Sequence, residues 1–122
     1  MPRSTISFDT VRDIALTLPG VVESTAYGVP ALKVHGKLLA CLPASRSAEP
    51  ASLVVRVDLD DRAELLDTDP AVYYVTDHYA GCSAVLVRLS RVHPDALRDL
   101  LGMAYKFVTR KAVPRSPARK RR

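Results

Sequence analysis

The sequence predicts a single α+β domain in which helices pack on an antiparallel sheet of five to six strands. Short β-prone runs are joined by glycine-containing turns, which is typical of hairpins. Amphipathic runs at helical spacing stand near both ends of the chain. Strands and helices do not alternate as they do in a parallel sheet, and 122 residues leave room for one core. The expected order is α-β(3-4)-α-β(2)-α.

The first half of the chain supplies one helix and a set of hairpin strands. Ser7 is expected to cap a helix that runs to Leu18, where Pro19-Gly20 ends it. The residues that follow are β-tolerant and include a two-residue link with glycine, which favours tight antiparallel pairing. The expected strands are 23–27, 31–34 and 37–42, with a turn at His35-Gly36.

The second half supplies the clearest strand and the clearest helix. Residues 52–57 alternate, with Leu53, Val55 and Val57 on one face. Asp58 caps a short helix with an apolar side of Leu59, Ala63 and Leu66. Runs 73–79 and 84–89 are expected to form the last hairpin. A final helix begins at Pro94, and its apolar stripe is Leu97, Leu100, Leu101, Ala104 and Val108.

The positive charge is concentrated at the C-terminus. The chain has 18 basic and 13 acidic residues, a net charge of +5. Residues 110–122 hold seven of the basic residues and no acid, so residues 1–109 carry 11 against 13. We therefore expect a folded domain at 1–109 with a charge of about −2, followed by a disordered basic tail at 110–122.

Four segments stand in a fixed order along the chain: LPGV at 18–21, YGVPALKVHGKL at 27–38, SLVVRVD at 52–58, and HYAG at 78–81 with VLVRL at 85–89. Together they resemble the MmcQ/YjbR family. The resemblance covers roughly residues 7–108, and it implies a secretion-chaperone-like topology with two β-hairpin wings. Members of that family are commonly labelled DNA-binding by analogy with a double-wing transcription factor domain, and they often carry Trp at the position of Tyr27.

Nucleic-acid binding is the leading functional hypothesis. Strand parity places Lys33, Arg56 and Arg88 on polar strand faces, where they would contact phosphates if the strands are neighbours. The alternative for these cations is a solvated face on which each one pairs with an acid. Tyrosines would add stacking surface, and the tail would lie on phosphates or in a minor groove. The full candidate set is Lys33, Lys37, Arg56, Arg88, Tyr27, Tyr79, Arg115, Arg119, Lys120, Arg121 and Arg122.

No motif in the sequence indicates catalysis, a metal or a cofactor. His78 and Cys82 are four residues apart, but a zinc site needs about four ligands, and a Cys–His nucleophile needs a third orienting group. We therefore expect a packed thiol and a turn histidine, no cofactor and no enzyme. The absence of an apolar leader or spanning segment, together with two unpaired cysteines, favours a cytoplasmic protein without membrane contact, as a monomer or weak dimer.

The sequence leaves a second class of function open. The sheet face would then hold a protein segment or a small ligand, with the basic tail acting only as a hook for polyanions. The two hypotheses differ in what they require of the sheet face. A continuous positive face favours nucleic acid, whereas an apolar groove lined by Tyr27, Tyr74 and Tyr79 favours a peptide or metabolite.

Overall fold

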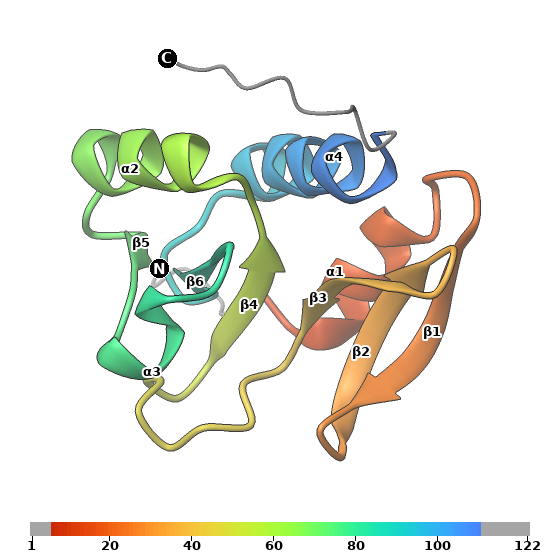
Figure 1. Cartoon of the computed structure of the whole chain (residues 1–122), viewed down its shortest axis with the longest axis horizontal. Coiled ribbons are helices and arrows are strands. Elements are labelled where there is room, and N and C mark those ends of the chain that lie inside the picture. The colour runs from red at the N-terminus through yellow and green to blue at the C-terminus, as the bar shows by residue number, and fades with distance from the viewer. Residues whose placement is uncertain (1–5, 111–122) are drawn as a thin grey trace, which may run out of the picture.

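The computed structural model describes residues 6–110, and Figure 1 shows them as an open sheet with helices packed against it. The sheet has six antiparallel strands in the spatial order β1-β2-β3-β4-β6-β5. The predicted α+β class is therefore confirmed. The elements are α1 (Phe8–Ala15), β1 (Val21–Ala26), β2 (Val29–Val34), β3 (Lys37–Cys41), β4 (Ser52–Arg56), α2 (Leu59–Thr68), β5 (Tyr73–Tyr74), α3 (Asp77–Ala80), β6 (Ala84–Arg88) and α4 (Pro94–Thr109).

Two tight turns build the first three strands into consecutive hairpins. Tyr27 and Gly28 join β1 to β2 with φ angles of 54° and 80°. His35 and Gly36 join β2 to β3 with φ angles of 53° and 78°. Two successive positive φ values are the requirement of a type I′ turn, whose twist matches that of the flanking strands.

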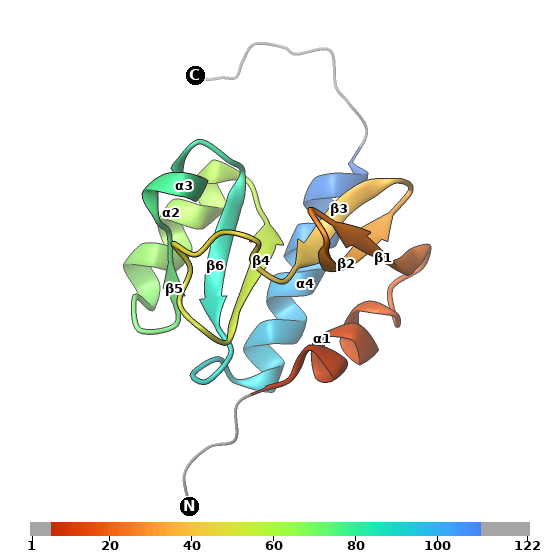
Figure 2. The same ribbon diagram turned by 90° about the horizontal axis from the view of Figure 1, so that it is seen from below.

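The sheet consists of two three-stranded halves with a narrow junction. Ladders of six and five residue pairs join β1 to β2 and β4 to β6. By contrast, β3 and β4 pair only through Ala40–Val55 and Cys41–Val54. We call β1, β2 and β3 the N-terminal half-sheet and β4, β6 and β5 the C-terminal half-sheet. Figure 2 shows the two halves on either side of α4.

One face of the sheet is covered by α1, α2 and α4 and carries the main core. Leu32, Ala40, Val55 and Val85 follow one another across four strands and all belong to this core. A bulge in the β2–β3 ladder lets both Leu39 and Ala40 contribute to it. The predicted stripe of α4 is confirmed, because all five of its members are buried: Leu97, Leu100, Leu101, Ala104 and Val108.

The opposite face carries a second, smaller apolar cluster, and we call it the open face. Ala31, Cys41, Val54 and Leu86 form the neighbouring row of the same ladders and lie in this cluster. Tyr79 of α3 packs against them. The open face is therefore apolar at its centre rather than uniformly polar.

Several predicted elements differ from the structure. The run 73–79 is not one strand, because β5 ends at Tyr74 and Asp77–Ala80 form α3. The predicted apolar side of α2 is confirmed only at Leu66, which packs on the core together with Leu65. It is wrong at the other two positions, since Leu59 is 47% exposed and Ala63 is exposed. The first helix ends at Ala15, one turn before Leu18, and a turn follows.

Candidate ligand pocket on the open face

A pocket of about 410 Å³ lies on the open face and spans the junction between the half-sheets. The N-terminal half-sheet contributes Tyr27, Leu38 and Cys41, whereas β4 contributes Val54 and Arg56. Few backbone pairs hold β3 to β4, so the two halves meet here at a hollow rather than as one smooth surface. Its volume falls within the range of about 300–1,000 Å³ that is typical of small-molecule sites. The remaining lining residues are Ala44, His78, Tyr79, Cys82, Ser83 and Ala84.

The lining combines an apolar floor with a few polar groups. Cys41, Val54, Tyr79 and Ala84 are buried members of the second cluster and form the floor. Arg56 carries the one permanent charge among the eleven lining residues, and none of them is Asp or Glu. Apolar lining with a small number of placed polar groups is the usual composition of a site for a small organic ligand.

The short helix α3 forms one wall of the pocket, and Arg62 of α2 holds this helix in place. Arg62 donates hydrogen bonds to backbone carbonyls of α3, of the turn that follows it and of the start of β6: Tyr79 (3.4 Å), Ala80 (3.1 Å), Cys82 (2.9 Å) and Ala84 (3.2 Å). The carbonyls of Tyr79 and Cys82 also accept backbone hydrogen bonds, from Cys82 N and Ala84 N, so Arg62 adds a second donor to each of them. No local signal in the sequence marks Arg62, since its partners come from 17 to 22 residues away.

Tyr27 stands at the rim of the pocket in an uncommon conformation. It is 83% exposed and has a positive φ of 54°, which a bulky residue rarely adopts. Asn, Asp or Gly would be the ordinary choice for this turn position. The exposed ring at this turn lies where it can contact a molecule in the pocket.

Tyr79 is not the exposed stacking residue that the sequence predicted. Its side chain is only 9% exposed, because α3 turns it onto the open face instead of leaving it on a strand. Burial, as the largest cause, together with the nearby Cys41 and Cys82 raises the pKa of Tyr79. The centres of the Tyr79 and His78 rings lie 4.7 Å apart, with the ring planes at 79° to each other. Tyr79 therefore forms part of the pocket floor.

The two cysteines and His78 all line the pocket, which their sequence spacing did not predict. Cys41 is buried and Cys82 is exposed, and both are free thiols. Burial raises the pKa of Cys41, which keeps it protonated at neutral pH. Within residues 6–110 no hydrogen bond joins His78 to either thiol, and no group of three metal-binding side chains occurs.

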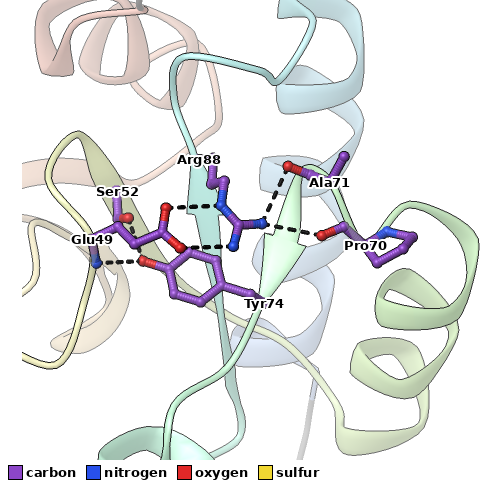
Figure 3. A network of polar contacts seen from close by, with 6 residues as sticks. All are labelled: Glu49, Ser52, Pro70, Ala71, Tyr74 and Arg88. Carbon is purple, nitrogen blue, oxygen red and sulfur yellow. Dashed lines mark hydrogen bonds and ion pairs between the residues drawn. The ribbon is translucent and has the colours of Figure 1, made fainter.

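Arg88 lies on the open face by register but is neutralised by Glu49. Figure 3 shows its guanidinium in a bidentate pair with the Glu49 carboxylate, with Nε–Oε1 at 2.9 Å and Nη2–Oε2 at 2.7 Å. Nη1 also donates to the carbonyls of Pro70 and Ala71. Tyr74 packs 4.3 Å from this guanidinium and does not line the pocket. Arg88 therefore anchors the 42–51 loop to β5 and β6.

The other predicted cations are dispersed. Lys33 lies on the open face, two strands from Arg56, and does not line the pocket. Lys37 pairs with Val34 of the main core and is exposed beside the turn, so the register assigns it to the other face. Taken with the Glu49 partner of Arg88, these positions do not form a continuous positive surface.

The basic tail lies almost entirely outside the described residues, including Arg115, Arg119, Lys120, Arg121 and Arg122. Its first residue is described and is ordered: Arg110 forms the C-cap of α4, pairs with Asp58 at 3.3 Å and stacks on Phe107. In residues 6–110, no helix is long and apolar enough to cross a membrane.

The architecture of this protein is an open antiparallel sheet with α1, α2 and α4 on one face, and with α3 and a pocket on the other. The chain belongs to the YjbR family, whose sequence model matches residues 16–107. This match confirms the resemblance drawn from the four segments. The crystal structure of Deinococcus radiodurans protein DR2400, a DUF419 domain, superposes with a TM-score of 0.71 at 23% identity, covering 91% of this chain and 84% of that one. This likeness shows a shared fold. No curated protein matches the chain.

Proposed function

We propose that the folded domain is a small-ligand-binding module that holds an organic molecule in the pocket without reacting with it. The observation that carries this proposal is the pocket itself: about 410 Å³, with an apolar floor and an aromatic rim, where the nucleic-acid hypothesis requires a continuous positive surface. The neutralisation of Arg88 by Glu49 supports the same conclusion.

The non-catalytic part of this proposal rests on the state of the polar groups in the pocket. Nucleophilic catalysis by cysteine needs a thiolate with an adjacent base. The buried Cys41 has a raised pKa, and in residues 6–110 neither thiol is hydrogen-bonded to His78. Binding requires only the shape and the polar contacts that the lining already offers.

An NMR titration of the ¹⁵N-labelled full chain tests the proposal. The probes are two-ring aromatics, 2-naphthamide and 2-naphthoate. We expect at least one of them to shift the amide resonances of pocket residues, with the largest changes near Tyr27, Tyr79 and Ala84. The variant Ala44→Phe places a ring at an exposed lining position and should abolish these shifts.

The matched control for Ala44→Phe is Ala63→Phe, which adds the same ring at an exposed position of α2 outside the pocket. This control should bind as the unsubstituted chain does. The proposal fails if neither probe shifts pocket amides, or if Ala44→Phe binds as well as Ala63→Phe.

A second function, nucleic-acid binding, is supported by the seven basic residues at 110–122. Because residues 1–109 carry a net charge of about −2, we expect the tail to provide the attraction. Fluorescence polarisation of duplex DNA should then show binding by the full chain at low salt, with a log–log salt slope of at most about −6. A chain that ends at Thr109 should not bind. Binding by that shorter chain would instead assign the contact to the folded domain, with Lys33, Lys37 and Arg56 as the residues to mutate.

A further inference from the structure

Arg56 is held at the pocket wall without a compensating acid. Its Nε donates to the carbonyl of Ser83 at 3.0 Å, and its guanidinium carbon lies 5.5 Å from the centre of the Phe107 ring. Both contacts fix the orientation of the side chain, and neither carries a negative charge. Within residues 6–110, no ion pair joins Arg56 to a carboxylate.

The neighbouring arginines are compensated in ways that Arg56 is not. Arg88 has the Glu49 carboxylate, and Arg110 takes Asp58, the acid that follows Arg56 most closely in sequence. Arg62 is surrounded by four backbone carbonyls. A half-buried guanidinium beside an apolar floor is costly when it has no anionic partner, so an arriving anion would gain more here than on open surface.

The geometry of the guanidinium selects the kind of anion. Arginine has five N–H donors in one plane, and Ser83 occupies the one on Nε. The remaining donors on Nη1 and Nη2 form a fork that matches two oxygens of a carboxylate or phosphate. The adjacent surface of Val54 and Ala84 is apolar, and it suits a hydrocarbon or aromatic body rather than a second charge.

We propose, resting on the ligand-binding function above, that the pocket takes a small organic oxyanion whose carboxylate or phosphate pairs with Arg56 and whose apolar, planar body lies between the floor and Tyr27. The chain would thereby discriminate an acid from its neutral amide. Since the charge-assisted bonds form only with the oxyanion, 2-naphthoate should bind at least about tenfold more tightly than 2-naphthamide.

The experiment measures dissociation constants of 2-naphthoate, 2-naphthyl phosphate and 2-naphthamide by the same NMR titration. The chains compared are the unsubstituted chain, Arg56→Met, Arg56→Lys and the control Lys33→Met. Arg56→Met should remove the preference for the anions and leave 2-naphthamide unchanged. Arg56→Lys should retain part of the preference, because the charge remains while the fork is lost. Lys33→Met removes an equal charge from the same face outside the pocket and should keep the preference.

The outcomes separate this inference from the ligand-binding proposal. Equal binding of acid and amide at the pocket overturns the oxyanion inference and leaves the ligand-binding proposal standing. The oxyanion inference is also overturned if Arg56→Met still prefers the anions and a cooperative urea denaturation curve shows that this variant is folded. If no probe shifts the pocket amides, both proposals fail. The tighter of the two anions identifies the preferred head group.

Discussion

Replacing Arg62 should destabilise the domain by much more than an ordinary surface arginine does. Arg62→Met keeps the aliphatic stem and removes every hydrogen bond to the four carbonyls. The bonds to Cys82 and Ala80 are exposed, so water replaces them at little cost. The bonds to Ala84 and Tyr79 are partly buried, and the latter is long at 3.4 Å. Hydrogen bonds from charged donors contribute about 1.5–3 kcal/mol each. We therefore expect a loss of about 2–3 kcal/mol in unfolding free energy.

Urea denaturation of three variants measures this effect. Arg62→Lys should lose about 1 kcal/mol, because one ammonium group reaches some of the carbonyls but lacks the planar fork. The control is Arg98→Met, which removes an exposed pair with Asp95 on α4 and should cost about 0.5 kcal/mol or less. The amides of Cys82 and Ala84 should also exchange faster in Arg62→Met. If Arg62→Met and Arg98→Met have the same midpoint, the reasoning about the α3 wall is refuted.

Three further predictions concern the Glu49–Arg88 ion pair, the two thiols and the main core. The hydrogen bond from Arg88 lowers the pKa of Glu49 below its ordinary 4.5. The ionised pair therefore stabilises the fold above that pH, and this contribution is lost as pH falls through the lowered pKa. The difference in stability between the unsubstituted chain and Glu49→Gln should accordingly narrow below about pH 4.5, as measured by urea denaturation across pH. Iodoacetamide should label exposed Cys82 rapidly and buried Cys41 only on unfolding, and equal rates by mass spectrometry would contradict their placement. Leu101→Ala should cost about 2–5 kcal/mol in the same denaturation assay, since Leu101 is fully buried, and a loss under 1 kcal/mol would contradict its core position.

Elements with strong local signals were predictable from the sequence. The final helix has a proline at its first position and an apolar stripe at helical spacing, and both signals act within a single segment. The turn at His35-Gly36 is likewise set by two adjacent residues with positive φ. Where the local chemistry alone fixes the conformation, the prediction and the structure agree.

The α3 helix was not predictable in this way. Residues 73–79 contain β-favouring tyrosines and valine, and their first two residues do pair with β6. Tertiary contacts favour the helix after Thr76. Arg62 donates hydrogen bonds to carbonyls at and just beyond the end of α3, and Tyr79 packs on the open face. Local propensity was overridden by contacts made across about 20 residues.

The pocket could not be predicted from the sequence for a related reason. Its lining comes from the β1–β2 turn, β3, the loop after β3, β4, α3, the turn after α3 and β6. These segments meet through tertiary contacts, among them the β3–β4 junction and the bonds from Arg62. Strand parity correctly assigned Arg56 to the face opposite the main core. Parity gives no information about partners, however, so Arg56 and Arg88 looked equivalent although Glu49 neutralises only Arg88.

The two arginines of the open face have different surroundings. Arg88 has a carboxylate, two carbonyls and a tyrosine ring around it, which is the environment of a structural anchor. Arg56 contacts one carbonyl and one aromatic ring, and it lines the pocket. Both lie on the same face and in the same half-sheet, and the loop that supplies Glu49 reaches only one of them. The cation left without an acid is the one that lines the pocket between the half-sheets. This is why we propose one small anion as the ligand of the open face, whereas a phosphate backbone would need several neighbouring charges.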